Sequence, residues 1–217
     1  MDLETIWPPF ALTVRTQDMD LTPVRESDYC ELADLARGGV RNDGIQAFLV
    51  DWDSGSPEEI ARSIAQYQWG TRANFRTDEW TIEFTVRVSG RIVGVQGVNS
   101  TSFLKTRAIS TGSWLAREEQ GKGYGTRMRS MIVTAFAEHF STTTFETAYV
   151  EDNHASRRVS EKVGYSPNSS RVTVTQDGEA HTEHRMILRA DDIRVPDAPV
   201  NVDGVNAFRQ FLGLDPS

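Results

Sequence analysis

Cysteine is nearly absent from this chain of 217 residues, because Cys30 is the only one. A single cysteine excludes an internal disulfide and a zinc site built from several cysteines, and it is typical of a reducing compartment. Cys30 falls within a predicted helix next to apolar positions, so we expect a buried core thiol.

Long apolar runs are also missing, since no stretch approaches the roughly 20 residues needed to cross a bilayer. The N-terminus, Met1-Asp2-Leu3-Glu4, lacks the basic flank and the apolar core of a signal peptide. These absences predict a soluble, cytoplasmic protein without a membrane segment.

Positive charge is in deficit, with 23 Lys and Arg against 31 Asp and Glu and a net charge of −8. This balance disfavours general binding to nucleic acid or to an anionic membrane. The distribution is uneven, because residues 1–60 carry a net −9 and residues 101–190 a net +2. The first quarter suits a cationic partner and the later half suits a small anion, unless ordinary variation in surface charge explains both.

The composition itself is that of a folded protein, with 38% hydrophobic and 25% charged residues. Alternating patterns predict strands at 80–88, 91–99, 108–115 and 143–150, and a hairpin over 171–188. Helices are predicted after the capping box Ser56-Pro57-Glu58-Glu59 and over 121–140 and 153–163. We expect a mixed α/β (α+β) domain over residues 1–190, followed by a C-terminal appendage with a short helix at 191–217.

The most informative segment is a glycine-rich turn between a predicted strand and a predicted helix, Gln120-Gly121-Lys122-Gly123-Tyr124-Gly125-Thr126. Glycines let a ligand approach the backbone, and the unpaired N–H groups and dipole of a helix start favour an anion. The spacing fails the dinucleotide fingerprint and the Walker A loop. A phosphate or pyrophosphate is the expected ligand, and a purely structural turn is the alternative.

Gln120, Gly123 and Gly125 also match the pattern Q/R-x-x-G-x-G/A. This pattern resembles the coenzyme A loop of the GNAT N-acetyltransferase superfamily. A second stretch, from Asn153 to Glu161-Lys162-Val163-Gly164-Tyr165, resembles another signature of that family. Gly112-Ser113-Trp114-Leu115 resembles the fourth strand of its RimJ/RimL-like branch. The resemblance covers about residues 12–190.

The resemblance implies a twisted, mostly antiparallel central sheet flanked by helices, with a V-shaped splay between the family's strands 4 and 5. It implies acetyl-CoA as co-substrate and no metal. The backbone amides of the turn would hold the pyrophosphate, namely those of Gln120, Gly121, Lys122, Gly123, Tyr124, Gly125 and Thr126. Leu115 and Arg117 would pair with the pantetheine arm, and Asn153 would bind that arm or simply cap its helix.

Acyl transfer to an amine needs a base, a donor to the oxyanion and a proton for the leaving thiolate. A backbone N–H of the Trp114–Leu115 strand is the expected oxyanion donor. Many family members place a tyrosine where this chain has Ser160, and the RimJ/RimL-like branch often has a serine where this chain has Ser156. The resemblance therefore makes Ser156 the preferred candidate beside the thiolate. Relatives often carry a glutamate where this chain has Ser110, which leaves the base open.

Glu83 is a candidate base acting through water, although a solvated strand glutamate is the plain alternative. His154 and His184 are further candidates, and both fit structural roles equally well. Residues 37–80 are expected to shape the acceptor pocket. There Asp51 and Asp53 either attract an amine or merely serve as caps and solvated side chains.

The predicted function is N-acetyltransfer from acetyl-CoA directly to a primary amine of a small molecule or a protein N-terminus. The alternative is a catalytically impaired acyl-CoA-binding sensor or interaction module. Another acyl donor, such as succinyl-CoA, also fits the sequence. Dimers are common in the family, so the resemblance allows a homodimer.

Overall fold

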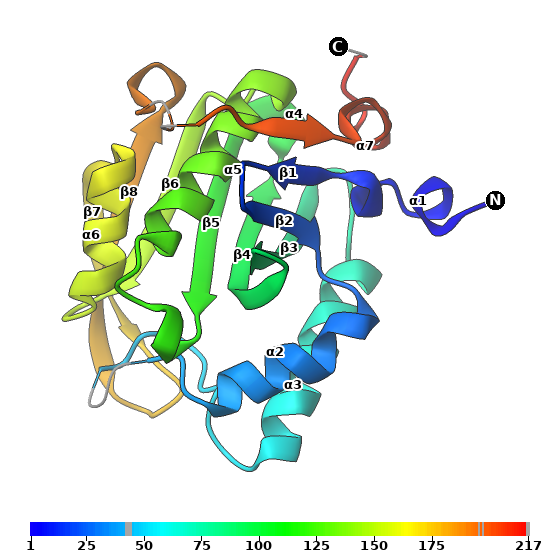
Figure 1. Ribbon diagram of the computed structural model, residues 1–217. Helices are drawn as coiled ribbons and strands as arrows, with labels where there is room; N and C mark the ends of the chain where they lie inside the picture. Colours follow the sequence, from blue (N-terminus) through cyan, green and yellow to red (C-terminus); the bar gives the residue numbers. More distant parts are fainter. Residues whose placement is uncertain (42–44, 195, 197, 216–217) are drawn as a thin grey trace.

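The computed structural model describes residues 1–41, 45–194, 196 and 198–215 and is built on a single sheet (Figure 1). Nine strands pair in the order β7-β8-β6-β5-β4-β3-β2-β1-β9. Their bounds are β1 Thr13–Arg15, β2 Met19–Pro23, β3 Glu79–Val88, β4 Arg91–Thr101, β5 Ala108–Leu115, β6 Thr144–Val150, β7 Ser166–Val174, β8 Ala180–Arg189 and β9 Asn201–Asp203.

Neighbouring strands run antiparallel except for β5 and β6, which run parallel. The hairpin connections follow local turn chemistry, because Ser89 and Gly90 both take a positive φ between β3 and β4. The connection from β5 to β6 instead crosses over through a helix, as a parallel pair requires. The mostly antiparallel sheet flanked by helices confirms the predicted fold class.

The helices of the structure are α1 Leu3–Ile6, α2 Tyr29–Arg37, α3 Pro57–Ala73, α4 Phe103–Thr106, α5 Tyr124–Phe140, α6 His154–Val163 and α7 Val205–Leu212, with short 3₁₀ turns at Pro8–Ala11, Glu26–Asp28, Arg117–Glu119 and Ala190–Asp192. Side chains of Asp2, Ser56 and Asn153 cap the starts of three helices, α1, α3 and α6. Ser56 and Glu59 form the predicted capping box at the start of α3, with N···O distances of 2.7 and 3.2 Å. No helix within the described ranges is long and apolar enough to cross a membrane.

The two faces of the sheet carry separate apolar cores. The larger core joins alternate residues of β3, such as Phe84 and Val86, to the buried face of α5, including Met131 and Phe136. The smaller core lies on the opposite face and joins α2 and α3 to Val95 of β4. Figure 1 shows α5 and α6 on one side of the sheet and α2 and α3 near its lower end.

The C-terminal segment packs into the domain. Strand β9 pairs with β1, from Thr13 opposite Asp203 to Arg15 opposite Asn201. Phe208 and Leu212 of α7 are fully buried in the larger core. The domain boundary at residue 190 stays a prediction, but the residues beyond it contribute an edge strand and core side chains.

The prediction of a buried Cys30 is wrong, because this thiol is exposed on α2. Helix α2 buries Leu32 and Ala36 against the smaller core. Cys30 lies two residues before Leu32, about 200° away around the helix, and therefore faces outward.

Candidate active site

The centre of the sheet contains a gap between β5 and β6. The two strands pair from Ala108 opposite Thr144 to Thr111 opposite Thr147, and the pairing then stops. Beyond that point β5 continues on β4 alone as far as Leu115. In the same way, β6 continues on β8 alone. The expected V-shaped splay is therefore present, between the strands labelled β5 and β6 in Figure 1.

Polar side chains close the narrow end of this splay. The Thr147 hydroxyl donates to the carbonyl oxygen of Thr111 at 2.9 Å. The Thr111 hydroxyl in turn lies 3.1 Å from the hydroxyl of Tyr165. These buried contacts tie the two strands together just where their backbone ladder ends.

The wider part of the splay exposes backbone groups of β5. Ala116 N–H donates to Val93 O at 3.0 Å, which makes Leu115 opposite Gly94 a pair that does not exchange hydrogen bonds. By alternation, the backbone of Trp114 bonds to β4, while the N–H groups of Ser113 and Leu115 point to the gap. The Leu115 carbonyl on that side accepts from Gln120 Nε2 at 3.0 Å.

The backbone groups of Arg117 are already hydrogen-bonded, although the resemblance implied that they pair with the pantetheine arm. The Arg117 N–H donates to Gly39 O at 2.8 Å, and its carbonyl accepts from Gln120 N. The strand ends at Leu115, and the chain then turns into the 3₁₀ segment Arg117–Glu119. The Arg117 guanidinium bonds to the carbonyl of Arg41. The structure therefore gives no support to a pantetheine contact at this residue.

The glycine-rich turn has the geometry of an open helix start. Gly121 and Gly123 have φ of +77° and +85°, and a Cβ at either position would meet no atom within 4 Å. Helix α5 follows Gly123 without a side-chain cap. The first N–H groups of the helix therefore have no partner within the helix and can bind an anion. Gly125 instead allows α6 to approach, because its Cβ would lie 3.2 Å from Val159.

One cavity of about 860 Å³ joins this turn to the splay. It brings together most of the predicted site residues, namely Glu83, Leu115, Gln120, Gly121, Gly123, Gly125, Thr126, Asn153 and Ser156. Lys122 and Tyr124 do not line it. The Lys122 ammonium pairs with Glu119 at 2.9 Å, and Tyr124 packs on the larger core.

The two candidate serines of α6, Ser156 and Ser160, have different surroundings. Asn153 Oδ1 accepts from Ser156 N at 3.1 Å, so Asn153 caps the helix while lining the cavity. Ser156 lines the cavity as well, and its hydroxyl has no partner among the described residues. Ser160 is fully buried, and its hydroxyl accepts from Arg129 at 2.8 Å. The geometry therefore favours Ser156 over Ser160 beside a ligand.

Glu83 lies in a row of residues that leads to the splay. Across the sheet it is opposite Gly97 of β4, which is opposite Gly112 of β5. A Cβ on Gly97 would meet a Glu83 carboxylate oxygen at 2.5 Å, so the carboxylate lies directly over this glycine. The backbones of β3 and β5 are two strand spacings apart, about 10 Å. With no side chain in between, the carboxylate can reach an amine or a water held at the splay.

The surroundings of Glu83 suit a base. Tyr67 of α3 donates from its hydroxyl to Glu83 Oε1 at 3.1 Å. Burial raises the pKa of Glu83 to about 7, although the Tyr67 hydrogen bond opposes this shift. The nearby Glu83 charge, together with burial, raises the pKa of Tyr67 well above its usual range. Glu83 can therefore accept and release a proton near neutral pH.

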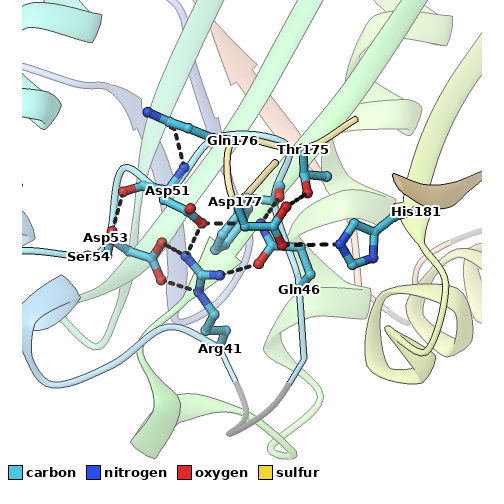
Figure 2. Close-up of polar contacts among 10 residues, drawn as sticks. Arg41, Gln46, Asp51, Asp53, Ser54, Thr175, Gln176, Asp177 and His181 are labelled. Atoms are coloured by element: carbon cyan, nitrogen blue, oxygen red, sulfur yellow. Dashed lines mark hydrogen bonds and ion pairs between the residues drawn. The ribbon is translucent and has the colours of Figure 1, made fainter. Parts of the chain in front are cut away.

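In the loop before α3, residues 45–53 contribute to one side of the cavity and are held by ion pairs to Arg41 (Figure 2). Arg41 donates to Gln46 at 2.7 Å, to Asp51 at 3.0 Å and to Asp53 at 2.8 Å. The Asp51 N–H donates to Gln176 in the β7–β8 turn at 2.8 Å. Both aspartates thus pair with Arg41, whose charge balances one of the two carboxylates, and hydrogen bonds to Gln46 and Arg41 lower the pKa of Asp51.

Aromatic residues of the same loop line the cavity rather than face away from it. Phe48 packs on Trp52 with ring centroids 5.4 Å apart, and Trp52 packs on Trp114 of β5 at 5.3 Å. All three line the cavity. The two candidate histidines do not line the cavity. His184 stacks on Tyr149, and His154 is exposed. The structure therefore places an apolar wall in the same cavity as Glu83.

Three residues at the site gain specific contacts only in the folded structure: Gly97, Tyr67 and Arg129. The first two become important only through their positions opposite Glu83 in the folded sheet. Arg129 is a buried cation on the apolar face of α5. A charged residue at a core position of a helix is the one local signal that marks it.

Comparison with known proteins agrees with this geometry. A sequence model of the family described as "Acetyltransferase (GNAT) domain" matches residues 18–166, which is more than half of the chain. The match includes β2 to β6, the glycine-rich turn and α6.

Solved structures share the fold at low sequence identity. RimL, a ribosomal-protein alpha-N-acetyltransferase in complex with coenzyme A, is 17% identical with a TM-score of 0.67, covering 83% of this chain and 99% of its own. RimJ from Mycobacterium smegmatis, in complex with a CoA disulfide, is 18% identical with a TM-score of 0.68, covering 94% and 95%. An acetyltransferase from Salmonella typhimurium that modifies the N-terminal serine of a 50S ribosomal subunit protein is 16% identical with a TM-score of 0.65, covering 80% and 96%.

Proposed function

This chain belongs to the GNAT acetyltransferase family, and we propose that it moves an acetyl group from acetyl-CoA directly to a primary amine. The acceptor is a small molecule or a protein N-terminus. One observation carries the proposal: an anion-binding helix start, a splayed strand edge and a carboxyl with a pKa near 7 share one cavity.

The described residues fit coenzyme A from one end to the other. The open glycine turn and the first N–H groups of α5 suit the pyrophosphate. The N–H groups of Ser113 and Leu115 suit the amides of the pantetheine arm, which takes the place of a missing strand. Asn153 and Ser156 line the opposite wall. This arrangement directs the thioester toward Gly112 and the row of residues that ends at Glu83.

The reaction then needs no covalent enzyme intermediate. Glu83, directly or through a water, takes a proton from the ammonium, and the neutral amine attacks the thioester carbonyl. A nitrogen–carbon bond forms, the carbon–sulfur bond breaks, and the sulfur leaves with the electron pair. The nitrogen, which is positively charged after the attack, then loses its second proton, and the neutral amide results. A backbone N–H of the splayed β5 edge stabilises the oxyanion. The Ser156 hydroxyl donates a hydrogen bond to the departing sulfur.

The acceptor half of the cavity favours a cationic ligand with an apolar part. Glu83 and Glu146 line it without a cationic partner among the described residues. Trp52, Trp114 and Phe48 add an aromatic wall that can contact an ammonium or a neighbouring side chain. A protein N-terminus, as modified by the Salmonella structural neighbour, is one acceptor with these properties.

The turn is tested by calorimetric titration of acetyl-CoA into Gly123→Glu and a control, Gly90→Glu. Both glycines have a φ near +85° and open space around them, so both substitutions cost about 1–3 kcal/mol of folding stability. Only Gly123→Glu places a carboxylate at the anion site, and we expect at least a tenfold loss of affinity there. Unchanged affinity in Gly123→Glu would show that the turn does not bind coenzyme A.

Catalysis is tested by thiol release from acetyl-CoA with a panel of amines that includes N-terminal peptides, aminoglycosides and polyamines. Release that depends on one class of amine supports the proposed reaction and identifies the acceptor. Tight acetyl-CoA binding without release for any amine favours the acyl-CoA sensor instead. Faster thiol release with succinyl-CoA would show that the transferred acyl group is succinyl, while the proposed reaction stays the same.

A further inference from the structure

A buried arginine joins the two walls of the splay. Arg129 of α5 is 3% exposed and lines the cavity. Its Nη2 donates to the hydroxyl of Ser113 on β5 at 3.0 Å, and its Nη1 donates to the hydroxyl of Ser160 on α6 at 2.8 Å. The guanidinium thus lies between the strand and the helix that enclose the pantetheine path.

This guanidinium has no counter-ion in the part of the chain that the structure describes. No carboxylate among the described residues lies within ion-pair distance of Arg129, and its Nε has no hydrogen-bond partner. A buried cation without a paired anion costs several kcal/mol, and two hydroxyl dipoles offset this cost only in part. Arginine keeps its proton in proteins, so the positive charge stays within the site.

The charge lies near the residues between which the proposed path of the pantetheine arm ends. Ser113 is adjacent to Gly112, where the row from Glu83 reaches the gap. On the other side, the Ser160 hydroxyl donates to the carbonyl of Ser156 at 3.0 Å. A sulfur atom placed between Gly112 and Ser156 therefore lies beside the guanidinium.

Other charged groups along the cavity have partners or are exposed to water. Arg41 pairs with Asp51 and Asp53, and Arg185 lies 3.6 Å from Glu183. Arg158 and Lys162 of α6 are exposed, so solvent screens them. The acids Glu83, Glu146 and Glu183 and the phenols of Tyr67, Tyr149 and Tyr165 oppose a nearby anion when ionised. Of the cations that the structure describes along the cavity, Arg129 is the buried one.

We propose that Arg129 stabilises the thiolate of coenzyme A as it leaves, and so acts as an electrostatic catalytic residue of the transfer. The inference rests on the proposed function, because it requires coenzyme A in the splay. When the carbon–sulfur bond breaks, the electron pair stays on the sulfur, beside the guanidinium. The second proton of the nitrogen, lost as the amide forms, neutralises that sulfur later, so the departing thiolate need not be protonated during bond cleavage.

The test measures the pKa of the CoA thiol in the binary complex, with no acceptor present. Thiolate absorbance is followed against pH, and the same titration with desulfo-CoA is subtracted to remove the signals of tyrosines. All proteins carry Cys30→Ser, so that the exposed thiol of this residue contributes no thiolate absorbance of its own. An ordinary cysteine thiol titrates near 8.5, and an opposite charge within about 4–6 Å lowers a pKa by about 1–3 units.

We expect the bound thiol to titrate at least one unit below free CoA, and Arg129→Met to remove this difference. Arg129→Lys keeps the charge and should keep most of the shift. Ser160→Ala removes a hydrogen bond to the guanidinium but not the charge, so it should also keep the shift while lowering stability. This control separates the charge of Arg129 from its role as a structural brace.

Equal thiol pKa values for free CoA and CoA bound to the otherwise native protein would overturn the proposal, even if Arg129→Met does not fold. An unchanged shift in a folded Arg129→Met protein would also overturn it. Failure of the native protein to bind CoA would refute the proposed function itself, and with it this inference.

Discussion

Replacing Glu83 with glutamine should both inactivate the enzyme and stabilise the fold, in a way that depends on pH. Burial raises the pKa of this carboxyl from 4.5 to about 7 in the folded protein. Between these pH values the folded state keeps a proton that the unfolded state has lost. The free energy of unfolding therefore falls as pH rises through this window.

The size of the effect follows from the shift of the pKa. Each pKa unit corresponds to about 1.4 kcal/mol, so the penalty approaches about 3 kcal/mol above pH 7. Glutamine carries no such penalty. The stability of Glu83→Gln relative to the native protein should thus increase by about 2–3 kcal/mol between pH 5 and pH 8, measured by urea unfolding.

As the pH rises, the activity of the native protein should increase while its free energy of unfolding falls. In the native protein kcat/KM should rise with an apparent pKa near 7, as Glu83 ionises, and loss of a general base lowers rates by about 10²–10⁴-fold. Glu79→Gln is the matched control, because Glu79 begins the same strand but lies exposed in a surface ion pair with Arg76. A stability difference that stays constant from pH 5 to pH 8 would refute the burial argument. An unchanged acidic limb in Glu83→Gln would refute its role as base.

Three further predictions concern the site walls, the C-terminal segment and the loop. Ser156→Ala should lower kcat about tenfold, the value of one hydrogen bond, while Ser160→Ala should chiefly destabilise the fold; a larger kcat loss in Ser160→Ala would contradict this assignment. Phe208→Ala should lower the free energy of unfolding by about 3–5 kcal/mol, and a change under 1 kcal/mol in thermal unfolding would show that α7 is not part of the core. Arg41→Met should destabilise by about 3 kcal/mol because Asp53, 5% exposed, loses its cation, and adding Asp53→Asn should restore part of that loss. If the double variant is no more stable than Arg41→Met, the ion pair does not hold the loop.

Some features of this protein follow from residues close together in the chain. Ser56 and Glu59 start a helix through contacts three residues apart, and Asn153 caps another in the same way. Gly121 and Gly123 produce an open turn because their positive φ is a local property. These signals were sufficient to predict the main helices and the open glycine turn, whereas the mostly antiparallel sheet was predicted from the family resemblance.

Other features depend on how distant segments meet. The sequence does not show that the pairing of β5 with β6 ends at Thr111, because the register of a parallel pair is set by the whole sheet. Nor does the sequence show that the chain leaves the strand at Leu115, so that the backbone of Arg117 bonds to Gly39 and Gln120. Cys30 was misassigned because helix rotation, not apolar neighbours, decides its exposure.

The sequence by itself determined the elements, the glycine turn and the family resemblance, since each depends on short-range capping, periodicity and backbone conformation. Only the tertiary structure decided which charged side chains are paired and which are buried. It placed Glu83 over Gly97, joined Asp51 and Asp53 to Arg41, and buried Arg129 without a counter-ion. The physical reason is that burial and pairing, which set the energy of a charge, arise from contacts between residues far apart in the chain.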